Sequence, residues 1–142
     1  MEAHKQFFYE YTVLYRPYFN QLNTVLSAFN LSLSQWMIMR FILDNGTHTI
    51  SEISIQRNVE RPTTTKMVQK LNELGYVEAR AGEDKRTKFI ELTKTGREVS
   101  KQVQEKVSNY QKYLLEEVSE ADQLLVAGVL RNISEKITTY KG

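Results

Sequence analysis

Residues 62–74 carry two stripes of side chains at helical spacing. One stripe is apolar apart from a threonine and consists of Thr64, Met67, Val68, Leu71 and Leu74. The second stripe and the start of the segment are mainly basic and polar: Arg61, Pro62, Thr63, Thr65, Lys66, Gln69 and Lys70. The hydroxyl, amide and charged groups of this second set can reach base edges or phosphates in a major groove. A simpler interpretation stays open for residues 63–65, namely a helix start that tolerates threonine.

Residues 81–86 form a charged, glycine-containing turn between two stretches with strand character, residues 76–80 and 87–92, which predicts a β-hairpin. Its basic side chains are Arg80, Lys85, Arg86 and Lys88. A guanidinium such as that of Arg86 suits the negative potential of a minor groove, and the other cations can neutralise phosphates. Asp84 cannot usefully face phosphate, so we expect its carboxylate to orient Arg86 through a hydrogen bond. Asp84 also fits an ordinary turn residue, or an exposed salt bridge worth about 0–1 kcal/mol.

The charge distribution agrees with these two clusters. The formal net charge is only +2, but residues 61–88 hold seven Lys or Arg residues against four acidic ones. A local positive stripe of this kind is expected where a protein contacts phosphates. A solvated helix face would give a similar pattern, so charge alone does not decide between them.

The elements that would position both clusters are mainly helical. Apolar residues at spacings of three and four predict a first helix over residues 5–28, with a kink expected at Pro17. A capping box at Ser32 and Gln35 opens an almost wholly apolar, buried helix over residues 35–43. A second box, Thr49 to Glu52, opens a short helix that ends near Asn58. Its inward-facing residues are expected to be Ile50, Ile53 and Ile55.

Two more helices are predicted to finish the chain, over residues 96–118 and 120–139, the second opened by a capping box at Ser119 and Asp122. Proline at a first helical position and glycine just beyond a helix end delimit residues 62–74. The order is therefore helix, short helix, tight turn, well-capped helix and charged hairpin, which is that of a winged helix-turn-helix. The expected fold class is mainly α with a small β-hairpin wing.

Composition excludes several other classes. The 142 residues include no Cys, which removes disulfides, thiolate nucleophiles and Cys-ligated zinc. His4 and His48 are poorly placed for a metal site, and we expect no cofactor. No apolar run approaches the roughly 20 residues of a membrane span, and the N-terminus has no signal peptide, so we expect a cytoplasmic protein. No nucleophile motif or phosphate loop indicates an enzyme, although a small hydrolase or lyase stays as a minor alternative.

The hairpin also contains the pattern D-x-R-x-x-x-x-x-L-T-x-x-G, at Asp84, Arg86, Leu92, Thr93 and Gly96. With the preceding block from Leu33 to Val77, the sequence here resembles the MarR family of bacterial regulators from end to end. The resemblance implies one domain over residues 1–142. Residues of about 1–31 and 96–142 would form dimerisation helices, and about 32–95 the winged helix-turn-helix. It also implies a recognition helix over residues 62–74 and a minor-groove role for Arg86.

Eight of the fifteen aromatic residues lie between Phe7 and Phe29, more than a lone surface helix should show. Dimerisation would bury this surface, and the alternative is packing within the chain. The candidate interface residues on the first helix are Phe7, Phe8, Tyr11 and Tyr15. Those on the last two helices are Leu114, Leu115, Val118, Leu124, Leu125, Val129, Ile133 and Ile137.

The resemblance further implies a homodimer on a roughly palindromic operator, acting as a repressor that a small aromatic or lipophilic ligand releases. Candidate pocket residues are Tyr11, Tyr15, Tyr18, Trp36, Met37 and Met39, for each of which core packing is the alternative. Without Cys, the thiol-oxidation control known in some family members is excluded. A winged-helix module that binds protein rather than DNA remains a rival function, in agreement with the modest net charge.

Overall fold

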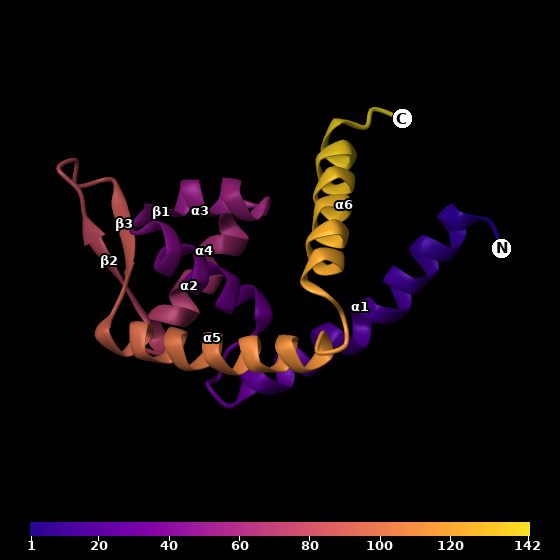
Figure 1. Cartoon of the computed structure of the whole chain (residues 1–142). Helices are drawn as coiled ribbons and strands as arrows, with labels where there is room; N and C mark the ends of the chain where they lie inside the picture. The colour runs from indigo at the N-terminus through magenta and orange to yellow at the C-terminus, as the bar shows by residue number, and fades with distance from the viewer. The chain divides into compact units, whose positions relative to one another are not determined.

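The computed structural model describes residues 1–142 and contains six helices and one small sheet (Figure 1). The elements are α1 (Ala3–Ser27), α2 (Leu33–Asn45), β1 (His48–Thr49), α3 (Ile50–Arg57), α4 (Arg61–Glu73), β2 (Val77–Ala81), β3 (Lys88–Leu92), α5 (Lys94–Leu114) and α6 (Glu120–Thr139). The chain divides into two compact units, Met1–Lys106 and Val107–Gly142. The predicted fold class, mainly α with a β-hairpin wing, is confirmed.

The sheet has three antiparallel strands in the order β1-β3-β2. In the predicted hairpin, Val77 lies opposite Leu92 and Ala81 opposite Lys88, so all five residues of each strand are paired. The hairpin extends beyond the helices of its unit in Figure 1. The two-residue strand β1 was not predicted; it pairs His48 with Ile90 and ties the chain before α3 to the root of the hairpin.

The start signals read from the sequence are present as hydrogen bonds. Ser32 and Gln35 form both bonds of a capping box before α2, and Thr49 and Glu52 do the same before α3. At Ser119 the hydroxyl accepts from the Asp122 N–H before α6. Each cap satisfies backbone donors that a helix end leaves without partners, so these helices begin where the caps occur.

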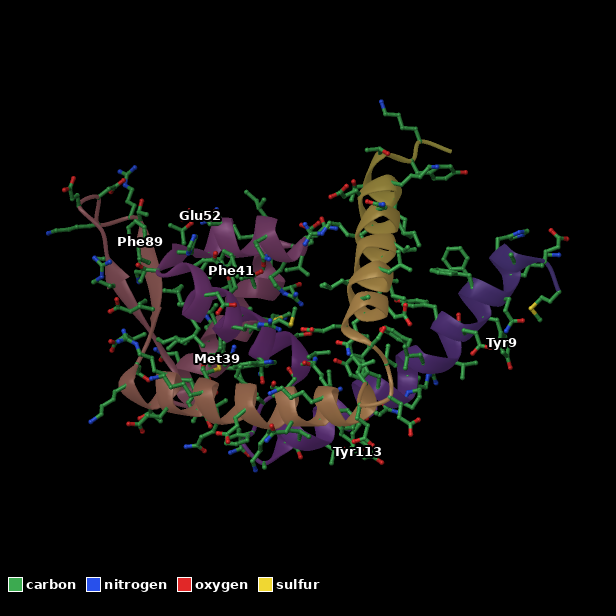
Figure 2. All side chains as sticks on the ribbon, in the orientation of Figure 1. Tyr9, Met39, Phe41, Glu52, Phe89 and Tyr113 are labelled. Atoms are coloured by element: carbon green, nitrogen blue, oxygen red, sulfur yellow. The ribbon has the colours of Figure 1, made fainter.

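The hydrogen bonds of its cap perturb the acidity of Glu52 at the start of α3. Hydrogen bonds from the backbone N–H and then the side chain of Thr49 hold the pKa of Glu52 below its usual value of 4.5, and the nearby His48 acts in the same direction. Glu52 lies on the exposed face of α3, as its label in Figure 2 shows. The cap therefore favours the charged carboxylate.

The core of the first unit centres on α2, as predicted. Trp36, Ile38, Met39 and Ile42 of this helix are buried, and Met39, labelled in Figure 2, is fully so. Other elements contribute Leu22, Leu26, Leu31, Ile53, Val68, Leu71, Tyr76, Val77, Ile90, Leu92 and Val103. This core fixes α3, α4 and the hairpin on one framework, because every one of these elements buries at least one apolar residue in it.

Two local predictions need correction. Ile55 does not face inward: it is 81% exposed, because residues two apart in a helix point to nearly opposite sides and α3 packs Ile53 on the core. Pro17 lies inside α1, so the first helix spans the proline as the sequence predicted. The helix predicted over residues 96–118 begins earlier and ends at Leu114, and a turn follows before α6.

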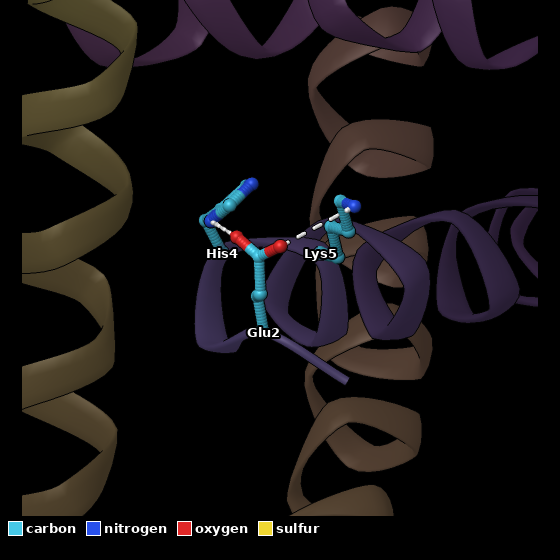
Figure 3. A network of polar contacts seen from close by, with 3 residues as sticks. All are labelled: Glu2, His4 and Lys5. Atoms are coloured by element: carbon cyan, nitrogen blue, oxygen red, sulfur yellow. Dashed lines mark ion pairs between the residues drawn. The ribbon is translucent and has the colours of Figure 1, made fainter.

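Polar contacts at the N-terminus are superficial. The Glu2 carboxylate lies 3.6 Å from both His4 Nδ1 and Lys5 Nζ, with all three side chains well exposed (Figure 3). Exposed pairs of this kind contribute about 0–1 kcal/mol. None of the six helices combines the length and the apolar character that a membrane span needs.

Candidate nucleic-acid interface

A tight turn sets α4 against α3. Asn58 adopts the left-handed conformation at φ 53° and ψ 46°, which asparagine tolerates better than most residues. The Val59 N–H then donates to the Ser54 carbonyl at 3.1 Å, which reverses the chain within three residues. Pro62 follows in the first turn of α4, where its missing N–H costs nothing. The two helices therefore form the helix-turn-helix that the sequence predicted.

One face of α4 is committed to the core. Thr64, Val68 and Leu71 are buried, and Met67 and Leu74 are half-buried, so all five residues of the predicted inner stripe turn inward. The helix ends at Glu73 with Leu74 as its C-cap, and Gly75 follows with a φ of +80°, the conformation that favours glycine. The register of the helix is thus fixed by packing, which determines which residues are left on the outside.

The candidate contact residues on that outside are not all equally available. Arg61, Pro62, Thr63, Lys66, Gln69 and Lys70 are exposed. Thr65 is half-buried, and its hydroxyl donates to the Arg61 carbonyl at 3.0 Å, so its donor is already used within the helix. Lys70 lies 3.9 Å from Glu73 in a loose surface pair that DNA could replace. Gln69 and Lys66 thus keep their polar groups available, as do Arg61 and Thr63 at the start of the helix.

The sequence interpretation missed one charged group at the same helix end. Glu60 is the N-cap residue of α4, is exposed and makes no side-chain capping bond. It brings a carboxylate next to Arg61 and Thr63, at the end of the helix that would otherwise favour phosphate. Its place directly before Arg61 and Pro62 was the signal that could have identified it.

Asp84 organises the tip of the hairpin through a carboxylate hydrogen bond to the backbone of Arg86. Its Oδ1 accepts a hydrogen bond from the backbone N–H of Arg86 at 3.0 Å, and its carbonyl accepts from Thr87 N–H at 2.9 Å. The two side chains of Asp84 and Arg86 form no ion pair. The carboxylate therefore shapes the turn through the backbone, and the exposed Arg86 guanidinium stays available for a partner.

Arg80 is the most constrained cation of the hairpin. Its Nε lies 3.5 Å from Glu91 across the two strands, and its guanidinium lies 5.6 Å from the centre of the Phe89 ring, which Figure 2 labels. Glu91 is largely covered, with 27% of its side chain exposed, and so offsets part of the charge of Arg80. Lys85, Arg86 and Lys88 carry no such partner and are the freer cations of the wing.

Comparison with known proteins decides the family. The sequence model of the MarR family matches residues 29–87. YwoH of Bacillus subtilis, an HTH-type transcriptional regulator, is 35% identical over 101 residues, which are 71% of this chain and 74% of that protein. The chain belongs to the MarR family. It is thus one of the winged helix-turn-helix transcriptional regulators.

Two further relatives support the assignment. SAV2265, an HTH-type regulator of Staphylococcus aureus, is 38% identical over 97 residues, 67% of this chain and 66% of that protein. The chain also matches the structure of Staphylococcus aureus MarR in complex with salicylate and kanamycin, with a TM-score of 0.87 and 29% identity. The match covers 97% of this chain and 94% of the Staphylococcus aureus chain. The MarR-family match therefore extends beyond the winged domain in the structural comparison.

The remaining candidate residues of this MarR-family chain are of two kinds. On α1, Phe7, Phe8, Tyr11 and Tyr15 are 38–53% exposed. In the second unit Leu114, Leu125 and Val129 are 38–66% exposed, and Ile133 is half-buried. A single chain thus leaves these apolar side chains with solvent contact.

Of the pocket candidates, Trp36 and Met39 belong to the core, whereas Met37 and Tyr18 are half-buried. Tyr15 packs edge-on against Phe19, with ring centres 4.6 Å apart. No group of three His, Asp or Glu side chains is arranged to hold a metal ion.

Proposed function

We propose that this MarR-family protein is a sequence-specific double-stranded DNA-binding repressor that acts as a homodimer on a pseudo-palindromic operator. The observation that supports this most is the exposed polar face of α4 in the same unit as a charged hairpin whose tip holds Arg86. A helix fits the major groove, and a guanidinium on a projecting loop fits the adjacent minor groove.

The contacts divide into two roles. Gln69 and Lys66, at the middle of the α4 face, would contact base edges and so determine sequence preference. Arg61, Lys70, Lys85 and Lys88 would neutralise phosphates, and Arg86 would enter the minor groove. Asp84 would act on Arg86 through the turn backbone rather than through a direct side-chain bond. Affinity would then depend on the wing, and sequence preference on α4.

A homodimer is proposed because the terminal helices carry more exposed apolar surface than a monomer tolerates. Exposed aromatic residues occur on α1, and exposed Leu and Val on the end of α5 and on α6. We assign residues of about 1–31 and 96–142 to dimerisation and about 32–95 to DNA binding. A twofold axis would place two recognition helices about 34 Å apart, one turn of B-DNA. The operator would be read as two half-sites, in the cytoplasm where bacterial DNA lies.

We further propose that a small aromatic or lipophilic effector releases the repressor. Support comes from the Staphylococcus aureus MarR relative, which was crystallised with salicylate and kanamycin. The dimer would have one conformation that fits DNA and one that does not. The effector need only bind the second conformation more tightly than the first. Among the pocket candidates, Tyr15, Tyr18 and Met37 are the more accessible, since Trp36 and Met39 serve the core.

Two substitutions test the assigned DNA face. An operator is first selected from a random duplex library. Arg86→Ala should then weaken binding to every duplex by about 1–3 kcal/mol, and the slope of log binding constant against log salt concentration should become shallower by about one. Gln69→Ala should instead change the ranking of operators that differ at single base pairs. Arg40→Ala and Gln56→Ala, at exposed positions of α2 and α3 outside the assigned DNA face and dimerisation segments, are the matched controls.

The result also separates the rival function. A winged-helix module that binds protein would leave wild-type protein indifferent to duplex DNA even at low ionic strength, where phosphate contacts are strongest. If wild-type protein binds DNA but neither Arg86→Ala nor Gln69→Ala alters binding, the DNA face has been assigned to the wrong surface.

A further inference from the structure

Tyr76 joins the end of the recognition helix to the loop that follows α1. Its hydroxyl donates to the Phe29 carbonyl at 2.7 Å, a contact between residues 47 positions apart. Tyr76 is 8% exposed and Phe29 is half-buried, so this bond has limited access to competing water. One hydrogen bond therefore links the segment after α4 to the junction of α1 and α2.

The acceptor end of this bond is held firmly. Phe29 lies in a closed turn in which its N–H donates to Leu26 at 2.9 Å, and Asn30 follows in the left-handed conformation at φ 61°. Asn23 of α1 accepts from the Leu33 N–H at 3.0 Å, which fastens the start of α2 to α1. The Phe29 carbonyl thus moves with α1.

The backbone of Tyr76 is fixed from the opposite side. Its N–H donates to Leu71 of α4 at 3.0 Å, and its carbonyl accepts from Thr93 N–H at 3.1 Å. The Thr93 hydroxyl donates to the Gly75 carbonyl at 2.6 Å and accepts from Gly96 N–H at 2.9 Å. Gly96 lies so close to Tyr76 that an added methyl group would overlap the Tyr76 carbonyl. The start of α5 therefore packs directly against the backbone of Tyr76.

We propose that the Tyr76 hydroxyl is a positioning group that sets the angle of α4 relative to α1, and through it the half-site spacing that the dimer accepts. The inference rests on the proposed homodimer and its DNA face. Tyr76 itself touches no DNA in this scheme. The turn after α1, the helix α4 and the residue before α5 all bond to Tyr76, and β2 begins directly after it. A small rotation at this residue is therefore carried to the exposed end of α4, about a helix length away.

The test removes only the hydroxyl, with Tyr76→Phe in the full chain. The measurement is the affinity for the selected operator and for versions with the half-sites moved one base pair closer or farther apart. The wild-type preference for its own spacing should fall about threefold or more in Tyr76→Phe, whereas affinity for a random duplex stays within twofold. Ser34→Ala, which removes a hydroxyl at an exposed position of α2 outside the assigned dimerisation and DNA-contact residues, should leave the spacing preference unchanged.

A second readout needs no DNA. Since the chain has no Cys, a spin label at Lys66→Cys reports the distance between the two recognition helices of a dimer. Tyr76→Phe should broaden or shift that distance distribution, and Thr93→Val, which removes the bond to Gly75 from the α5 side, should do the same if Tyr76→Phe fails to fold.

An equal loss of affinity for all duplexes, or an unchanged spacing profile with an unchanged label distance, would overturn the positioning role. Wild-type protein that is monomeric or ignores duplex DNA would instead overturn the proposed function. The two failures are thus distinguishable.

Discussion

Gly96→Ala tests the seat of α5 on Tyr76 directly. A methyl group at residue 96 would overlap the Tyr76 carbonyl oxygen, lie 2.8 Å from the carbonyl carbon and lie 3.1 Å from the Tyr76 Cα. These are backbone atoms, so no side-chain rotation relieves the overlap, and α5 must shift. Overpacking of this kind costs about 1–3 kcal/mol.

Two further effects decide the net change. Alanine favours a helix over glycine by about 1 kcal/mol, which opposes the overlap. A shift of α5 also weakens the bonds of Thr93 to Tyr76 and to Gly96, each worth about 0.5–1.5 kcal/mol. With the overlap near the upper end of its range, we expect Gly96→Ala to lower the free energy of unfolding by about 2–4 kcal/mol.

The matched control is Gly128→Ala in α6, because an added methyl group there meets nothing within 4 Å. It should raise the free energy of unfolding by up to about 1 kcal/mol through helix propensity alone. Urea denaturation followed by circular dichroism, at one protomer concentration for all variants, measures both changes. If Gly96→Ala is as stable as Gly128→Ala, α5 does not pack on Tyr76 as described.

Two more predictions concern α3. The Thr49 hydrogen bonds lower the pKa of Glu52 in the folded state, so the stabilisation they give is present above the unfolded pKa of about 4.5 and is lost as the pH falls through the folded value. The urea midpoint of Glu52→Gln should therefore fall less between pH 6 and pH 3 than that of wild type, and parallel curves would contradict this. Ile53→Ala should destabilise the fold by about 2–5 kcal/mol because Ile53 is fully buried, whereas Ile55→Ala, at an 81% exposed position, should change stability by less than about 0.5 kcal/mol. Equal losses of thermal stability in the two variants would mean that α3 does not turn Ile53 to the core and Ile55 to solvent.

Much of the fold was predictable because its signals are local. Capping boxes at Ser32 and Thr49 and the Pro62 to Gly75 boundaries depend on hydrogen bonds and dihedral preferences within about four residues. The hairpin also followed from a turn between two short β-prone stretches. These features placed α4 and the wing, and with them most of the candidate DNA face, before any tertiary contact was considered.

Tertiary packing decided what local patterns could not. The pairing of His48 with Ile90 and the bond from Tyr76 to Phe29 join distant residues, and no spacing in the sequence encodes them. Ile55 is as apolar as Ile53, so only the orientation of α3 on the core determines which one is buried. Local chemistry thus determined where α2, α3, α4 and α6 begin, because caps and first-turn proline act over one turn. The availability of each side chain on those helices depended on packing between them, since burial is a property of the assembled core.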